Sequence, residues 1–209
     1  MKIKVCGMKY AENIQAVAEL KPDFMGFIFY DRSPRFALTE LGQAQISNLP
    51  EKITRVGVFV DEGLSDVLQI CSEYGISTVQ LHGTESPEFC RSLKKTGLEI
   101  IKAFGVDERF DFGITNAYAK VIDCFLFDTK SLAHGGSGKK FDWSLIKRYE
   151  SDIPYFLSGG IGLEHLNEIK KMNDDRLLAI DVNSRFEIKP GIKNINTLQT
   201  LFKEVKNEI

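Results

Sequence analysis

The chain has 209 residues, of which 43% are hydrophobic and 27% are charged, and its formal net charge is −2. This length suffices for one substantial core but not for two full domains, and no apolar run approaches the roughly 20 residues that cross a bilayer. Because the chain has no block of like charges and no long apolar N-terminal region, we expect a cytoplasmic protein without a nucleic-acid or membrane partner.

Eight β-rich runs recur along the chain, and most are apolar throughout, which is typical of strands buried on both faces. They are residues 3–6, 24–30, 54–60, 77–81, 99–104, 120–127, 154–158 and 177–182. Between them, apolar residues three and four positions apart predict helices. These segments are 10–20, 64–74, 86–96, 141–149, 163–172 and 195–205. The fifth connection, 105–120, has poor helical periodicity and predicts only a short helix.

Alternating strands and helices predict a parallel sheet, because parallel neighbours need long crossovers. Dividing 209 residues among eight units gives about 26 each, a normal length for one strand plus one helix. We therefore expect an α/β fold, a (β/α)8 TIM barrel of eight parallel strands ringed by helices, as one domain over 1–209. A doubly wound open sheet is the alternative, but it usually carries a Gly-rich dinucleotide fingerprint where this chain reads CGMKYAE.

Two strand-end side chains are candidates for acid–base chemistry, since such barrels place their reacting groups at the C-terminal ends of strands. Asp128 follows the apolar run CFLF, and burial there would favour its neutral, proton-donating form. Cys6 ends the first run and could act as a base if nearby positive charge activates its thiol. The alternatives are a turn-capping aspartate and a core cysteine. The remaining cysteines, which have no zinc-ligand spacing and are expected in the core, are Cys71, Cys90 and Cys124.

Two loops near the end of the chain predict a phosphate site. Gly159 and Gly160 lie in SGGIG between the seventh strand and the next helix, where backbone N–H groups can approach an anion. Asn183, Ser184 and Arg185 follow the eighth strand, and barrels commonly bind phosphate between these two loops. Glycines that serve tight turns only are the alternative.

Further polar side chains at strand ends are candidates for substrate contacts; they are Arg35, His82 and Asp181. The glycine-rich loop around Gly136 is either a mobile cover over the site or a long connector.

The motifs together resemble a known family. KVCGM, GFIFYDRSPRF, VGVFVDE and VQLHGTE occur in order, followed by FLFDT with GGSGKKFDW, then FLSGGI and DVNSRFEIKPGIK. Over essentially the whole chain they closely resemble phosphoribosylanthranilate isomerase of tryptophan biosynthesis. The resemblance implies a cofactor-free and metal-free Amadori rearrangement of a small phosphorylated substrate by a monomer or homodimer.

The same resemblance assigns roles to residues. It implies that Cys6 is the general base, that Asp128 is the general acid and that Arg35 faces the anthranilate carboxylate. It also implies that the SGG glycines and the loop after the eighth strand hold the phosphate, and that Asp181 contacts substrate hydroxyls. One departure stands out, because relatives commonly read SSG where this chain has Asn183, Ser184 and Arg185.

Two other functions fit parts of the pattern. A phosphosugar epimerase or a histidine-branch barrel would share the phosphate loops. Such epimerases usually need metal ligands at strand ends, where this chain offers only His82 as an imidazole. The histidine-branch enzymes use two aspartates, whereas the first strand here ends in Cys6. A non-catalytic phosphosugar-binding barrel would keep the glycines and could lose the acid and base, both of which this chain has.

Overall fold

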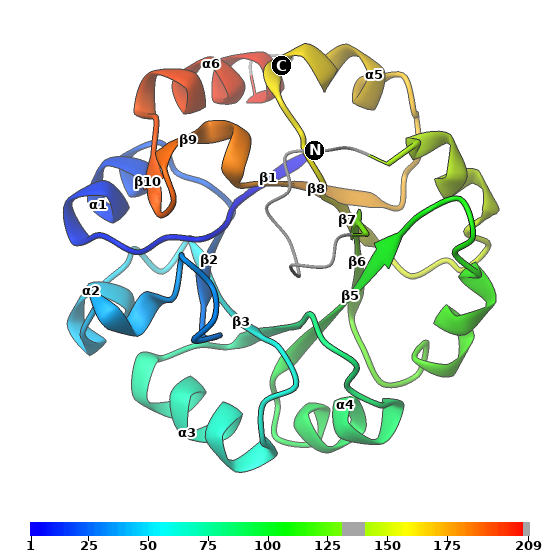
Figure 1. Cartoon of the computed structure of the whole chain (residues 1–209), viewed down its shortest axis with the longest axis horizontal. Helices are drawn as coiled ribbons and strands as arrows, with labels where there is room; N and C mark the ends of the chain where they lie inside the picture. Colours follow the sequence, from blue (N-terminus) through cyan, green and yellow to red (C-terminus); the bar gives the residue numbers. More distant parts are fainter. Residues whose placement is uncertain (131–140, 207–209) are drawn as a thin grey trace.

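Eight parallel strands close into one barrel in the order β1 to β8, with β1 hydrogen-bonded to β8 (Figure 1). The computed structural model describes residues 1–130 and 141–206. The strands are β1 (Lys2–Val5), β2 (Phe24–Ile28), β3 (Thr54–Phe59), β4 (Thr78–Leu81), β5 (Glu99–Val106), β6 (Cys124–Thr129), β7 (Tyr155–Leu157) and β8 (Leu177–Val182). The predicted (β/α)8 barrel is confirmed.

Helices surround the barrel (Figure 1). The α-helices are α1 (Ala11–Glu19), α2 (Gln43–Ser47), α3 (Leu64–Tyr74), α4 (Pro87–Lys94), α5 (Leu166–Lys170) and α6 (Ile195–Lys206). Short 3-10 turns are η1 (Ala37–Thr39), η2 (Phe112–Ala117), η3 (Trp143–Arg148), η4 (Leu163–His165) and η5 (Ser184–Phe186). An antiparallel pair, β9 (Glu187–Lys189) and β10 (Ile192–Lys193), follows β8.

The structure departs from the predicted elements in four places, one of which is the helix α2, where no helix was predicted. The segment 141–149 was expected as an α-helix but forms the 3-10 turn η3, at whose start the Asp142 carboxylate accepts the Ser144 N–H. Strand β6 begins at Cys124 rather than at residue 120, because residues 118–121 form a turn in which the Val121 N–H donates to the Tyr118 carbonyl. The hairpin β9–β10 was not predicted.

Strand alternation divides the apolar side chains into two cores. One set faces the helices, with Ile3 and Val5 of β1 among its members. The other set comes from the alternate positions of the strands and fills the barrel interior; it comprises Cys6, Phe24, Val56, Val58, Ile101, Ala103, Leu126, Phe156 and Ala179. Side chains that continue this inward set toward the strand ends therefore meet at the mouth of the barrel.

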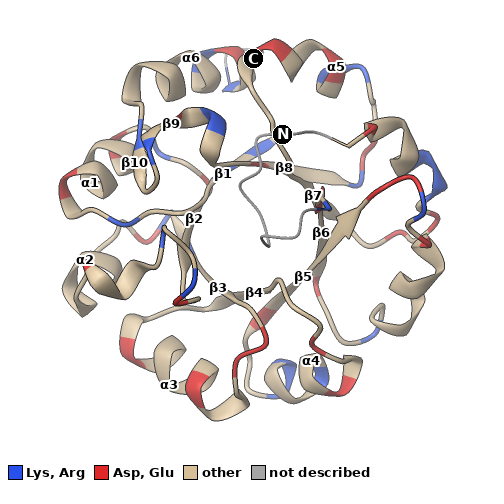
Figure 2. Ribbon diagram, viewed as in Figure 1, with Lys and Arg blue, Asp and Glu red and all other residues tan. Residues whose placement is uncertain are grey.

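The outer surface carries both charge signs. Figure 2 shows Lys and Arg as well as Asp and Glu spread around the ring of helices. In the described part of the chain, no helix is both long enough and apolar enough to span a membrane.

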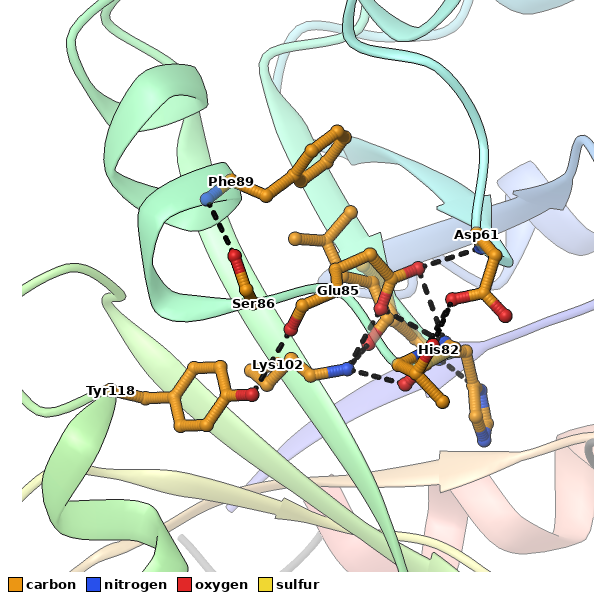
Figure 3. Close-up of polar contacts among 11 residues, drawn as sticks. Asp61, His82, Glu85, Ser86, Phe89, Lys102 and Tyr118 are labelled. Atoms are coloured by element: carbon orange, nitrogen blue, oxygen red, sulfur yellow. Dashed lines mark hydrogen bonds and ion pairs between the residues drawn. The ribbon is translucent and has the colours of Figure 1, made fainter.

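A buried ion pair ties β5 to the segments that follow β3 and β4 (Figure 3). The Lys102 ammonium lies 2.8 Å from the Glu85 carboxylate, and the two side chains are only 1% and 2% exposed. The same carboxylate accepts the backbone N–H groups of Asp61 and Gly83, and the Tyr118 hydroxyl donates to the Glu85 carbonyl. The pair therefore fixes the loop that follows β4.

We predict that Lys102→Met lowers the free energy of unfolding by about 3 kcal/mol or more, because the substitution leaves Glu85 buried without its counter-charge. Urea unfolding measures this loss. The matched control is Lys94→Met, whose ion pair with Asp123 is 37% and 40% exposed. That variant should lose less than about 1 kcal/mol, and equal losses in the two variants would contradict the prediction.

Candidate active site

One cavity of about 410 Å³ opens at the C-terminal ends of the strands. Every site residue predicted from the sequence lines it: Cys6, Arg35, His82, Asp128, Gly159, Gly160, Asp181, Asn183, Ser184 and Arg185. These residues come from β6 and β8 and from the segments that follow β1, β2, β4, β7 and β8. The volume lies in the usual range for small-molecule sites, so the barrel gathers the candidates into a single binding cavity.

Asp128 lies near the end of β6 with its carboxyl group in the cavity. Burial, helped by the negative charge of Asp181, raises the pKa of Asp128 to about 6. The Thr129 N–H donates to one carboxyl oxygen, and His82 Nε2 lies 3.5 Å from the other. The expected desolvation is present, so Asp128 can hold a proton close to neutral pH.

Cys6 directly follows β1, and its backbone N–H extends the barrel ladder by donating to the Val182 carbonyl. Its sulfur lies beside Gly26, where an added Cβ would come within 2.7 Å of Sγ. Burial raises the pKa of the Cys6 thiol, while the charges of Lys4 and Lys193 act in the opposite direction. The free protein therefore holds Cys6 mainly as the neutral thiol.

A buried polar network lies beneath the cavity. The Lys4 ammonium donates to Gln80 Oε1 at 2.6 Å and to Asp181 Oδ1 at 3.1 Å. The Ser158 hydroxyl lies 3.3 Å from the other Asp181 oxygen. Burial alone would lower the pKa of Lys4, but the charges of Asp181 and Cys6 raise it above its ordinary value. A permanent positive charge thus lies between Asp181 and the thiol.

The two predicted phosphate loops lie at the cavity edge. Gly159 and Gly160 have φ values of +89° and +62°, which glycine adopts without strain. A Cβ at Gly159 would also collide with the Thr129 backbone and hydroxyl. The Arg185 guanidinium, 43% exposed, lies 3.3 Å from Glu164, so this departure from the family pattern has a carboxylate partner.

Arg35 lies over the glycine of the KVCG motif. Its guanidinium is bound by Glu187, with contacts of 2.6 to 3.1 Å. Gly7 has a φ of +75°, and a Cβ there would lie 2.6 Å from Arg35 Cδ and 2.8 Å from Asn183 Oδ1. Glycine at position 7 therefore lets two cavity side chains rest on the backbone next to Cys6.

Sequence reasoning missed three buried charged residues of the site. Lys4 could have been found, because it lies two positions before Cys6 in β1 and therefore faces the same side of the sheet. Glu187 and Lys193 lie on the unpredicted hairpin β9–β10. Burial lowers the pKa of Lys193 to about 8, against the opposing charge of Glu187.

The loop around Gly136 lies outside the described residues. Among the residues that the structure describes, no cluster of three or more His, Cys, Asp or Glu could hold a metal ion.

A family model and curated relatives show one family. The model of N-(5'-phosphoribosyl)anthranilate (PRA) isomerase matches residues 3–204. N-(5'-phosphoribosyl)anthranilate isomerase of Parabacteroides distasonis is 43% identical, over 98% of this chain and 93% of that protein. The crystal structure of phosphoribosyl anthranilate isomerase from Thermotoga maritima superposes with a TM-score of 0.84 at 32% identity, covering 99% of both chains. A crystal structure of phosphoribosyl anthranilate isomerase in complex with reduced 1-(o-carboxyphenylamino)-1-deoxyribulose 5-phosphate gives a TM-score of 0.80 at 30% identity, with 99% of both chains covered.

We predict that Gly7→Ala lowers the free energy of unfolding by about 3 kcal/mol, since left-handed strain and overpacking add. The matched control is Gly75→Ala at the end of α3, where φ is +62° but an added Cβ meets nothing within 4 Å. That variant should lose only about 1 kcal/mol, the strain alone. Urea unfolding of the two variants measures the difference, and equal losses would refute the claim that Arg35 and Asn183 crowd Gly7.

Proposed function

The chain belongs to the N-(5'-phosphoribosyl)anthranilate isomerase family, and we propose that it performs this isomerisation with Cys6 as general base and Asp128 as general acid. It is an isomerase of tryptophan biosynthesis. The product is 1-(2-carboxyphenylamino)-1-deoxyribulose 5-phosphate, and we propose that no cofactor takes part. The observation that carries the assignment of roles is that the buried thiol and a carboxyl group with a pKa of about 6 line one cavity.

The proposed sequence begins with neutral Asp128. Its carboxyl proton passes to the ring oxygen of the ribose, the C1'–oxygen bond breaks, and the nitrogen lone pair forms the protonated Schiff base. The Cys6 thiolate then removes the C2' proton, and the electron pair of that bond neutralises the iminium nitrogen to give an enolamine. Tautomerisation moves a proton from the C2' hydroxyl to C1' and yields the ketone. Asp128 has lost one proton and Cys6 has gained one, so exchange with water resets the enzyme.

The other cavity residues would hold the two charged ends of the substrate. We assign the anthranilate carboxylate to Arg35 and the phosphate to the backbone of Gly159 and Gly160 with the loop 183–185. Asp181 would accept hydrogen bonds from ribose hydroxyls. Its carboxylate lines the cavity, and the hydrogen bond from the Lys4 ammonium to Oδ1 holds it in place. His82 lies next to Asp128, so we assign it a contact with the ribose beside the proton donor.

The free protein favours the opposite protonation states from those that the reaction needs. The pKa of Asp128 is about 6, whereas that of Cys6 lies above its ordinary value. Neutral Asp128 together with Cys6 thiolate is therefore a minor form at neutral pH. The charge of Lys4 lowers the pKa of the thiol and so favours the thiolate, and it also acts to lower the pKa of Asp128.

A phosphorylated biosynthetic substrate and four cysteines without a disulfide support a cytoplasmic location.

We predict that Cys6→Ser and Asp128→Asn each lower kcat by about 1,000-fold or more, because proton transfer by a positioned group is lost in each. A fluorescence assay that follows the loss of phosphoribosylanthranilate measures turnover. Inhibition by inorganic phosphate serves as the control and should change less than about twofold, since neither side chain belongs to the phosphate loops. Near-wild-type turnover in both variants would contradict the mechanism.

We predict that kcat/KM rises about tenfold per pH unit up to about pH 6 and is then flat to above about pH 8. Below the pKa of Asp128 the acid stays protonated while the thiolate fraction grows. Between the two pKa values, the growing thiolate fraction is cancelled by the loss of neutral Asp128. Steady-state kinetics measures the profile.

An NMR titration of the Asp128 carboxyl carbon in the free protein separates this ionisation from that of the substrate phosphate, with Asp128→Asn to assign the signal. A carboxyl group that titrates near about pH 4, its ordinary range, would contradict the assignment of Asp128 as the acid.

A further inference from the structure

Glu187 occupies one edge of the Arg35 guanidinium. Arg35 Nε donates to both carboxylate oxygens, at 2.9 and 3.1 Å, and Nη2 donates to Oε2 at 2.6 Å. Within residues 1–130 and 141–206, which the structure describes, Nη1 donates no hydrogen bond. A guanidinium offers carboxylates two forked edges. Here Glu187 occupies the Nε–Nη2 edge. The Nη1–Nη2 edge of this cavity-lining arginine can therefore receive a second carboxylate.

Lys193 holds Glu187 in place. Its ammonium lies 2.7 Å from Glu187 Oε1, and the two side chains are 0% and 4% exposed. The Gly191 N–H donates to the same oxygen at 3.0 Å. Although burial opposes it, the hydrogen bonds from Arg35 and the charge of Lys193 lower the pKa of Glu187. The carboxylate is therefore ionised, and its contacts fix its orientation.

Arg35, Glu187 and Lys193 together carry one surplus positive charge, because the single carboxylate of Glu187 pairs with two cations. A buried cluster with this excess is suited to one more anion, and Arg35 is its member that lines the cavity. An arginine side chain that is already held along one edge loses less conformational entropy when it binds an anion than a mobile arginine does.

We propose that Glu187, fixed by Lys193, is a positioning residue that aims the Nη1–Nη2 edge of Arg35 at the aromatic carboxylate of the substrate. This inference rests on the proposed function, in which Arg35 receives that carboxylate. It assigns Glu187 and Lys193 no contact with the substrate. Their effect on the reaction passes through the orientation of Arg35.

Glu187→Gln separates positioning from simple electrostatics. The substitution keeps the size of the side chain and raises the charge of the cluster by one. A through-space charge effect would therefore tighten the binding of anions. Loss of positioning would weaken it, because an amide oxygen can accept only part of the Arg35 fork and its N–H₂ group faces the guanidinium.

The test measures wild type and Glu187→Gln with phosphoribosylanthranilate, and with anthranilate and inorganic phosphate as separate probes. Anthranilate binding is followed by its own fluorescence, which does not depend on turnover. We expect KM and the anthranilate dissociation constant to rise by about tenfold together, which corresponds to about 1.4 kcal/mol. We expect kcat and phosphate inhibition to change by less than about threefold. Unchanged or tighter anthranilate binding would overturn the proposal.

A double-mutant cycle tests whether Glu187 acts through Arg35. Arg35→Lys keeps the charge but removes the fork, so adding Glu187→Gln to it should weaken anthranilate binding by less than about twofold. An equal loss in both backgrounds would show a general structural role and overturn the proposal. If Glu187→Gln does not fold, Glu187→Asp, which keeps the charge but shortens the reach, takes its place.

Glu164→Gln is the matched control, because Glu164 also pairs with an arginine that lines the cavity, Arg185. It makes the same change of charge and should leave anthranilate binding within about twofold. If wild type does not turn over phosphoribosylanthranilate, the proposed function fails. The anthranilate arms still decide whether Glu187 positions Arg35.

Discussion

The pairing of the first strand with the last is the constraint on which the site depends. β1 and β8 are joined over four residue pairs, with Lys4 opposite Asp181, and the Cys6 N–H continues the ladder to Val182. Inside the barrel the same two opposed residues form an ion pair of 3.1 Å. β1 is held between β2 and β8. The thiol that directly follows it therefore has a fixed position at the mouth.

Much of this arrangement follows from strand periodicity. Apolar runs predicted all eight strands, and the rule that barrels react at strand ends gathered the site candidates before their contacts were known. The burial of Asp128 followed from the preceding run CFLF. Glu187 and Lys193 could not be found in this way, because β9 and β10 are only three and two residues long and carry no periodic pattern. Glu187 matters for the site because it binds Arg35, which lies 152 residues away in the chain. Local sequence spacing cannot predict a contact between residues so far apart.

Burial acts to raise the pKa of two carboxyl groups near the mouth, and their charged partners decide the outcome. Asp128 and Glu187 are both buried carboxyl groups. The first has a second carboxylate, Asp181, as a neighbour, and its pKa rises to about 6. The second binds two cations, and its pKa falls despite burial. This contrast separates a group suited to proton transfer from one suited to holding a cation, although both are acidic residues at the same end of one barrel.

Lys193 also connects the two ends of the proposed substrate site. Its ammonium binds Glu187 on one side and Asn183 Oδ1 on the other, each at 2.7 Å. Glu187 holds Arg35, and Asn183 begins the loop assigned to the phosphate. The groups assigned to the carboxylate and to the phosphate are thus tied to one buried cation, and both rest on Gly7. Fixing this spacing before a ligand arrives reduces the ordering that binding would otherwise require. It favours a ligand that carries both anionic groups at the matching separation, whereas a ligand with only one of them gains from only one end of the site.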